Sequence, residues 1–163
     1  MINAIFAHDS SYGIGKNGAL PWPHSPADMK WFSDNTKNSV VIMGRKTWES
    51  LGSMRLKNRV NIVLTRNIES VIGNPDMVLC AQGDALYETI INIAENYASK
   101  KLWIIGGAEL YKQTIPYCDH LYITAFKQQY DCDTFIDKSL IKPFTQASIK
   151  ETDDCTFSIW TRL

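Results

Sequence analysis

A single carboxylate stands among large apolar side chains in the first part of the chain. Asp28 follows a long loop over residues 9–24 and is flanked by Met29, Trp31 and Phe32. Apolar surroundings disfavour a charged carboxylate, raise its pKa and suit it to hold a cationic or amidine-like ligand. The helix dipole also favours Asp in any first helical turn, so a structural role is about equally well supported by position alone. No neighbour offers the partner that a glycosidase pair or a nucleophilic triad needs.

Two glycine-containing patterns invite a nucleotide-binding interpretation. Residues 13–18 read Gly-Ile-Gly-Lys-Asn-Gly and match G-x-G-x-x-G, a fingerprint that needs a helix to begin at its third glycine. Pro21 and Pro23 exclude that helix, so we interpret the segment as a mobile glycine loop capped by an apolar hook at 20–22. The stretch from Gly44 to Thr47 lacks the earlier glycine of a P-loop.

A second glycine pair ends a buried apolar strand and precedes a helix. Bare backbone N–H groups at Gly106-Gly107 suit a phosphate or the polar edge of a cofactor, although a tight strand-to-helix turn explains the pair nearly as well. Arg45, Lys46 and Arg66 each follow the carboxyl end of an expected strand, where basic side chains can converge on a phosphate. Taken singly, each is better explained as an ordinary surface charge.

Strands and helices alternate along the chain, and there is no internal repeat. We expect strands at 2–8, 40–43, 60–65, 77–80, 102–105, 121–126 and 156–160, and helices at 26–36, 45–51, 84–97 and 108–115. This order predicts an α/β fold with helices on both faces of the sheet and an antiparallel C-terminal edge. Ligands of such sheets bind at the carboxyl ends of the strands.

Length and composition limit the classes of protein. A chain of 163 residues predicts one domain, 1–163. Lys plus Arg and Asp plus Glu are 17 each, and this balance argues against nucleic-acid binding. No apolar run reaches a membrane-spanning length and no export signal opens the chain, so we expect a cytoplasmic protein with no membrane partner. The four cysteines lack zinc-site spacing, so no metal is expected and the thiols are interpreted as inert.

Four ordered segments together resemble one family. They are Gly15-x-x-Gly18-x-Leu20-Pro21-Trp22, Asp28-x-x-Trp31-Phe32, the run Val41-Ile42-Met43-Gly44-Arg45-Lys46-Thr47-Trp48-Glu49-Ser50, and Ile104-Ile105-Gly106-Gly107-x-x-x-Tyr111. Their order and spacing closely resemble dihydrofolate reductase over nearly the whole chain. The resemblance implies a mostly parallel eight-stranded sheet, a monomer, and NADPH-dependent reduction of dihydrofolate to tetrahydrofolate in one-carbon metabolism. It also implies binding of antifolate-type small molecules.

The resemblance assigns roles to particular residues. Asp28 would hydrogen-bond the 2-amino group and ring nitrogen of the pterin and assist protonation of N5 through water, and Thr124 would bond both Asp28 and the pterin. Catalysis is thereby assigned to Asp28, Thr124, Leu20 and Tyr111. The apolar walls around the pterin and benzoyl groups would be Ile5, Met29, Phe32, Leu51 and Ile105. Arg59 would pair with the glutamate carboxylate, which its bidentate fork suits.

The cofactor residues are implied in the same way. Around the nicotinamide, flanked by Tyr111, would lie Ala7, Ile14, Gly15, Ala19 and Leu20. Around the ribose and 2′-phosphate would lie Gly44, Arg45, Lys46, Thr47, Thr65 and Arg66, within an adenosine-binding subdomain of approximately 39–99. Around the pyrophosphate would lie Gly106, Gly107, Ala108, Glu109 and Leu110. The basic residues of the second set favour NADPH over NADH.

Three segments depart from the common family pattern. The stretch 23–26 is one residue longer, which alters how the loop before it closes. Residues 54–59 lack the usual Pro-Gly before the arginine, so Arg55 or Lys57 is an alternative to Arg59. Glu109 is acidic where a basic or neutral residue is more usual, so it either weakens cofactor binding or points to solvent.

Three other functions compete with this one. The related reductase of riboflavin synthesis shares the architecture but does not need Asp28 with Trp31-Phe32, and the deaminase motif that accompanies it is absent. A pterin-binding protein that has lost turnover would bind ligands without oxidising NADPH. A protein–protein adaptor would have no reason to keep the cleft residues together.

Overall fold

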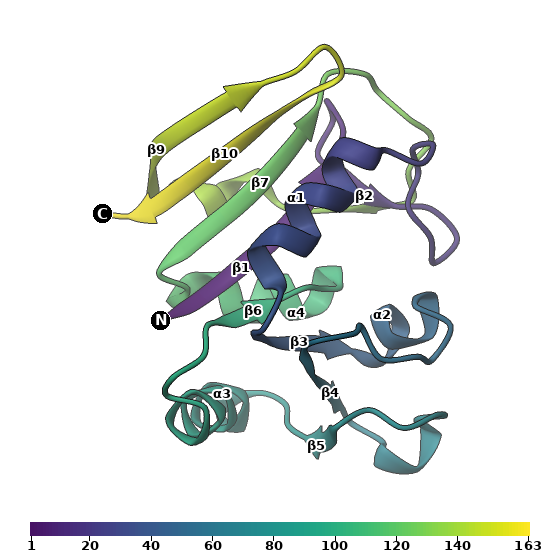
Figure 1. Ribbon diagram of the computed structural model, residues 1–163, viewed down its shortest axis with the longest axis vertical. Helices are drawn as coiled ribbons and strands as arrows, with labels where there is room; N and C mark the ends of the chain where they lie inside the picture. Colours follow the sequence, from purple (N-terminus) through teal and green to yellow (C-terminus); the bar gives the residue numbers. More distant parts are fainter.

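One eight-stranded sheet organises the molecule in the computed structural model, which describes residues 1–163 (Figure 1). Its strands lie in the order β5-β4-β3-β6-β1-β7-β10-β9. Their bounds are β1 Ile2–His8, β3 Val40–Gly44, β4 Val60–Thr65, β5 Met77–Cys80, β6 Leu102–Ile104, β7 His120–Phe126, β9 Phe144–Glu151 and β10 Cys155–Arg162. The strands from β5 to β7 pair in parallel, whereas β10 pairs antiparallel with both β7 and β9. The expected α/β sheet with an antiparallel C-terminal edge is confirmed.

The helices cover both faces of the sheet. Their bounds are α1 Pro26–Thr36, α2 Arg45–Ser50, α3 Asp84–Asn96 and α4 Ala108–Thr114, and short 3-10 turns lie at Ile68–Ser70, Ile115–Tyr117 and Lys138–Ile141. In Figure 1, α1 crosses in front of the strands. None of these helices combines the length and the apolar character needed to cross a membrane.

Alternation along the buried strands divides the core between the two faces. In β3, Val40 and Ile42 belong to a cluster that also contains the buried side chains of α3 and α4. Val41 and Met43 belong to a second cluster, against which Phe32 of α1 and Leu51, next to α2, pack. Successive strand residues point to opposite faces, so a strand buried on both faces is apolar at every position. This pattern keeps α1 and α2 together on the face that carries Asp28.

The structure corrects the expectation of a long structureless loop over 9–24. Residues Gly13–Gly15 form a short strand, β2, which pairs antiparallel with β8, Thr134–Phe135. The sequence contains no sign of this pairing, because the two strands come from distant parts of the chain and are only three and two residues long.

The structure also adds an edge strand that we did not expect. Strand β9 is exposed at every position after Phe144, so it carries no apolar alternation that would mark it as a strand. It forms because β10 offers it a free row of backbone groups. Strand β10 itself extends to 155–162, beyond the expected 156–160.

Candidate active site

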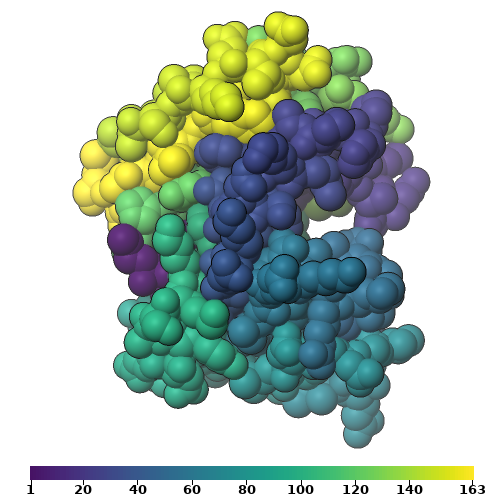
Figure 2. Space-filling model, in the orientation of Figure 1, coloured from purple at the N-terminus to yellow at the C-terminus, as the bar shows by residue number.

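A large cleft opens at the carboxyl ends of the parallel strands. Its volume is about 1450 Å³, whereas sites for one small ligand usually occupy about 300–1,000 Å³, so there is room for two ligands side by side. In Figure 2 the surface is hollowed between the purple N-terminal loop and the blue segment that follows α1. The structure brings together in this cleft every site residue expected from the sequence except Arg59: Ile5, Ala7, Ile14, Gly15, Ala19, Leu20, Asp28, Met29, Phe32, Gly44, Arg45, Lys46, Thr47, Leu51, Thr65, Arg66, Ile105, Gly106, Gly107, Ala108, Glu109, Leu110, Tyr111 and Thr124.

Asp28 lies in the first turn of α1 and faces the cleft. Ser25 caps the helix, its Oγ accepting a hydrogen bond from the Asp28 backbone N–H at 3.3 Å, and Pro26 occupies the first turn. Burial raises the pKa of the Asp28 carboxyl above its usual value, and a hydrogen bond with the Thr124 side chain partly offsets this effect. Thr124 is buried on β7, so a helix and a strand distant in sequence hold the two groups together.

No cation compensates the Asp28 carboxylate. The carboxylate lies close enough to the buried Cys155 thiol to contribute to raising the pKa of that thiol, after the larger effect of burial. A partly buried carboxyl with a raised pKa, hydrogen-bonded to one hydroxyl, can hold a proton closer to neutral pH than an exposed Asp does. It can also accept hydrogen bonds from an amidine-like edge of a ligand.

Apolar side chains form the walls around this carboxyl. Ile5 is buried, Phe32, Leu51 and Ile105 are half-buried, and Met29 is 50% exposed at the rim. Trp31 also lines the cleft, and its indole Nε1 is buried without a hydrogen-bond partner in the protein. The sequence placed Trp31 beside Asp28 but did not show whether the ring packs in the core or faces the cleft.

The glycine pair between β6 and α4 brings bare backbone to the centre of the cleft. The Gly106–Gly107 peptide is cis, and the Gly106 carbonyl accepts a hydrogen bond from the Gly44 N–H at 2.8 Å. Gly106 has φ +124°, and a Cβ there would lie 3.2 Å from Thr47 Oγ1 and 3.3 Å from the Tyr111 hydroxyl. Only glycine combines this backbone conformation with so close an approach of two side chains.

The Tyr111 hydroxyl is already engaged inside the protein. It donates a hydrogen bond to the Ile5 carbonyl at 2.8 Å, and burial raises its pKa far above the usual value. Tyr111 therefore offers a ring edge to the cleft rather than a titrating group. This hydrogen bond joins α4 to the central strand β1.

The first turn of α2, which follows β3, and the loop after β4 carry the basic part of the cleft. Arg45 is held only by an exposed ion pair with Glu49 at 3.7 Å, and Lys46 and Arg66 are exposed. These long cations are free to reorient toward an anionic group. Glu109 is exposed on the rim near the glycine pair, where its carboxylate accepts a hydrogen bond from Gln113 Nε2 at 3.0 Å.

Arg59 does not line the large cleft. Its Nη1 donates to Thr36 Oγ1 at 3.0 Å and its Nε donates to the Lys57 carbonyl at 2.9 Å, with the guanidinium 5.9 Å from the Phe32 ring centroid. It borders a second, smaller cavity of about 300 Å³ with Asn38, Asn58, Val60 and Lys100. Since Phe32 belongs to the large cleft, Arg59 stands just beyond its outer end.

The structure also distinguishes Arg59 from Arg55 and Lys57, the two alternative residues for binding a carboxylate. Arg55 forms an ion pair with Asp76 at 3.1 Å and donates to the Asn74 carbonyl, so it is committed elsewhere. Lys57 is exposed and does not line the cleft, and its carbonyl accepts the hydrogen bond from Arg59 Nε. Of the three basic residues in this loop, Arg59 alone stacks near a cleft residue.

Residues that the sequence did not single out as site residues complete the lining. They are Phe6, Gly18, Trp31, Ser50, Leu64, Asn67, Ser70, Ala81, Gln82, Gly83, Leu86, Gln113 and Thr134. Residues 67–70 and 81–83 follow the carboxyl ends of β4 and β5, so the rule that selected Arg66 finds them as well. Thr134 had no such signal, because only the pairing of β8 with β2 brings it to the cleft.

Comparison with known proteins agrees with this geometry. The family model described as dihydrofolate reductase matches residues 1–162. The chain belongs to the dihydrofolate reductase family. A dihydrofolate reductase of Haemophilus influenzae is 36% identical over 159 residues, covering 91% of each chain. One from Heliothis virescens is 40% identical over 152 residues, covering 84% of this chain and 80% of that protein.

Bifunctional and solved members of the family also match. A bifunctional dihydrofolate reductase-thymidylate synthase of Daucus carota is 36% identical, and the match covers 86% of this chain but only 29% of that protein. The solved dihydrofolate reductase of Enterococcus faecalis, complexed with NADP(H) and RAB-propyl, has a TM-score of 0.87 at 30% identity and covers 99% of this chain and 96% of its own.

Proposed function

We propose that this protein catalyses the NADPH-dependent reduction of 7,8-dihydrofolate to 5,6,7,8-tetrahydrofolate, a step of one-carbon metabolism. The observation that carries the proposal is the Asp28 carboxyl, half-buried beside Thr124 at one end of a cleft whose volume suits two ligands. Membership of the dihydrofolate reductase family supports the same reaction.

The residues present fit a phosphate-bearing dinucleotide. Gly106, with no room for a side chain, leaves backbone open for a pyrophosphate, and residues 106–110 would hold that group. Residues 44–47 with Thr65 and Arg66 would hold the ribose and 2′-phosphate, so 39–99 would act as the adenosine-binding part. When bound, NADPH supplies the hydride that the pterin ring receives.

Asp28 supplies binding and proton control for the pterin. Its carboxyl accepts hydrogen bonds from the 2-amino group and the ring nitrogen, while the Thr124 hydroxyl orients it. Burial raises its pKa, so it holds a proton up to a higher pH than an exposed Asp does, which favours delivery of that proton, through water, to N5. The walls formed by Ile5, Phe32 and Ile105 exclude bulk water and keep this carboxyl poorly solvated.

The remaining roles follow from position in the cleft. Leu20, 59% exposed at the tip of its loop, would close over the nicotinamide with Ile14 and Ala19. Tyr111 would flank the same nicotinamide ring. Arg59 would bind the glutamate carboxylate beyond Phe32. Antifolate-type molecules would occupy the pterin end, and the protein would act as a monomer.

The deciding experiment follows the loss of NADPH absorbance when dihydrofolate is added to the purified protein and to Asp28→Asn. We expect turnover in the wild type and a loss of about 10²–10⁴-fold in the variant, the usual contribution of a positioned acid–base group. Wild-type turnover retained in Asp28→Asn at neutral pH would refute the role of Asp28. A folded wild type that binds NADPH without oxidising it would establish a binding protein in place of an enzyme.

A further inference from the structure

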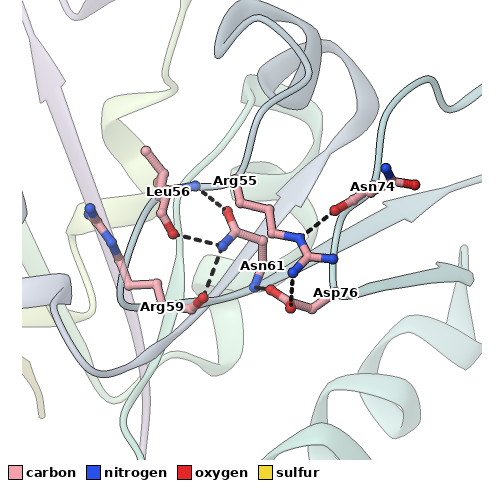
Figure 3. A network of polar contacts seen from close by, with 6 residues as sticks. All are labelled: Arg55, Leu56, Arg59, Asn61, Asn74 and Asp76. Carbon is pink, nitrogen blue, oxygen red and sulfur yellow. Dashed lines mark hydrogen bonds and ion pairs between the residues drawn. The ribbon is translucent and has the colours of Figure 1, made fainter.

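A buried asparagine outside both cavities ties together the loop that precedes β4. The Asn61 side chain is fully buried, and its Oδ1 accepts a hydrogen bond from the Leu56 N–H at 2.9 Å. Its Nδ2 donates to the carbonyls of Leu56 and Arg59, both at 3.0 Å (Figure 3). Every hydrogen-bonding atom of this amide is thus used on one short loop, and a buried amide left unpaired is costly.

Asp76 and Arg55 in turn hold the Asn61 backbone in place. Asp76 accepts a hydrogen bond from the Asn61 backbone N–H at 2.7 Å, and its own N–H donates to the Asn61 carbonyl at 2.9 Å. The other carboxylate oxygen of Asp76 pairs with Arg55 at 3.1 Å, and Arg55 also donates to the Asn74 carbonyl (Figure 3). The loop is therefore fastened near both ends, at Arg55 and at Arg59.

The loop needs such fastening because its own sequence provides no stiffness. Residues 55–59, Arg-Leu-Lys-Asn-Arg, contain no proline to stiffen the loop, and Asn58, rather than a glycine, adopts the left-handed conformation at φ +60°. A residue with a side chain is strained in this region unless its surroundings hold it there. The hydrogen bonds of Asn61 to residues on both sides of Asn58 provide that restraint.

The restraint determines where the Arg59 guanidinium lies. The Arg59 carbonyl is held by Asn61, while its side chain reaches Thr36 and stands near the Phe32 ring. Arg59 forms no ion pair with any carboxylate of the protein, so its charge remains available to a ligand at the outer end of the cleft.

We propose that Asn61, held in place by Asp76 and Arg55, is a positioning residue for Arg59 and thereby sets the affinity for the carboxylate-bearing tail of the substrate. This inference rests on the proposed function, in which Arg59 binds that tail. Asn61 touches no ligand. Its contribution is the orientation of a cation that would otherwise move with a flexible loop.

The test compares two substrates, dihydrofolate and a dihydropterin that lacks the benzoylglutamate tail. For Asn61→Ala we expect KM for dihydrofolate to rise about tenfold, the scale of one hydrogen bond to a charged group, with kcat within about twofold. The KM for the tail-less pterin should stay at the wild-type value. Asn74→Ala is the matched control, because it removes an exposed asparagine side chain of the same network while keeping the carbonyl that Arg55 uses.

Arg59→Ala and the double variant separate this inference from the proposed function. If Asn61 acts through Arg59, the double variant should bind dihydrofolate no more weakly than Arg59→Ala alone, because the two effects are not additive. If Arg59→Ala affects both substrates equally, the tail-binding role of Arg59 is wrong. If Arg59→Ala is selective for the tail but Asn61→Ala is not, the positioning role is overturned and the reductase assignment stands.

A second variant, Arg55→Ala, keeps the Asn61 side chain and tests the proposal if Asn61→Ala does not fold. Arg55→Ala removes the exposed end of the network and leaves every hydrogen bond of the Asn61 side chain in place. We then expect a smaller rise in KM for dihydrofolate only, about threefold, as for the loss of a partly exposed ion pair. An unchanged KM for dihydrofolate in Arg55→Ala would overturn the proposal in that case.

Discussion

At the scale of single residues, the site combines a carboxyl that has no cationic partner with a set of solvent-accessible cations, of which only Arg45 forms an ion pair. Asp28 is half-buried without a cationic partner, and a carboxylate in this environment is worse solvated than it is in the unfolded chain. The cleft is also lined by basic side chains and by the acidic Glu109. Each of these features has a consequence for stability or affinity that substitution can isolate.

The raised pKa of Asp28 predicts that this residue costs the protein stability at neutral pH. Its contribution is favourable while the carboxyl is protonated, below its unfolded pKa of about 3.9, and is lost as pH rises through the raised folded value. Asp28→Asn should therefore unfold at higher urea than the wild type at pH 7, with the difference shrinking toward pH 4. If Asp28→Asn were less stable than the wild type at pH 7, the Asp28 charge would not be destabilising and the prediction would be wrong.

Glu109 should weaken binding of an anionic cofactor. Its exposed carboxylate stands on the rim near the glycine pair, so it repels phosphate groups there. Glu109→Gln should lower the Kd for NADPH about two- to fivefold at low salt, with the gain fading as ionic strength rises. Fluorescence titration measures this, with Glu95→Gln on α3 as a control outside the cleft. Equal Kd values at low salt would mean that Glu109 points to solvent.

At the scale of elements, one buried carboxylate joins the loop over 9–24 to a distant segment. Asp9 accepts hydrogen bonds from the backbone N–H groups of Ser11, Gly13 and Tyr130 at 2.8–2.9 Å and from the Cys132 thiol at 3.4 Å. These donors lower its pKa despite the opposing effect of burial, the largest single cause. The first residues of the loop that carries Leu20, 9–13, are therefore held in place against residues 130–132.

Loss of the Asp9 charge should weaken these hydrogen bonds and lower the free energy of unfolding. A depressed folded pKa means that the stabilisation is present above the unfolded value of about 3.9 and is lost as pH falls through the folded pKa. Asp9→Asn should lower the free energy of unfolding by about 1–3 kcal/mol at pH 7 and by less at pH 3. Urea titrations at the two pH values measure this. Asp131→Asn, in an exposed ion pair with Lys16, is the control and should change little. A pH-independent deficit in Asp9→Asn would contradict the charge-based account.

At the scale of the whole molecule, the sheet carries apolar clusters on both faces, and one continuous cleft lies at its carboxyl edge. The cleft extends from Asp28 to the loops after β4 and β5. Ligands at its two ends would contact elements from both halves of the sheet. Binding at either end should therefore stabilise the entire fold.

We expect NADPH to raise the Tm of the protein. Adding dihydrofolate or an antifolate to the NADPH-bound protein should raise the Tm further. A ligand at 100 times its Kd adds about 2.7 kcal/mol to the free energy of unfolding. Differential scanning calorimetry with NADPH, NADH and each pterin ligand measures these shifts. NADH, which lacks the 2′-phosphate, should give a smaller shift than NADPH at equal concentration. Equal shifts would remove the reason for assigning Arg45, Lys46 and Arg66 to that phosphate.

Local patterns were sufficient for the elements whose residues carry their own signal. The apolar runs of β1, β3, β4 and β6 and the caps of α1 appear directly in the sequence, because burial on both faces and capping are local requirements. Strand β9 could not be found this way, since its exposed residues depend on a neighbouring strand for their hydrogen bonds.

The site divides along the same line. Local patterns predicted a strand-to-helix turn or phosphate site at 106–107 and basic residues after two other strands that can converge on a phosphate, because parallel strands place their carboxyl ends together. Three features became visible in the folded molecule alone: Arg59 lies outside the cleft, Arg55 pairs with Asp76, and Asn61 holds their loop. These outcomes depend on which side chains satisfy buried polar groups across distant segments, and a linear pattern contains no record of that competition.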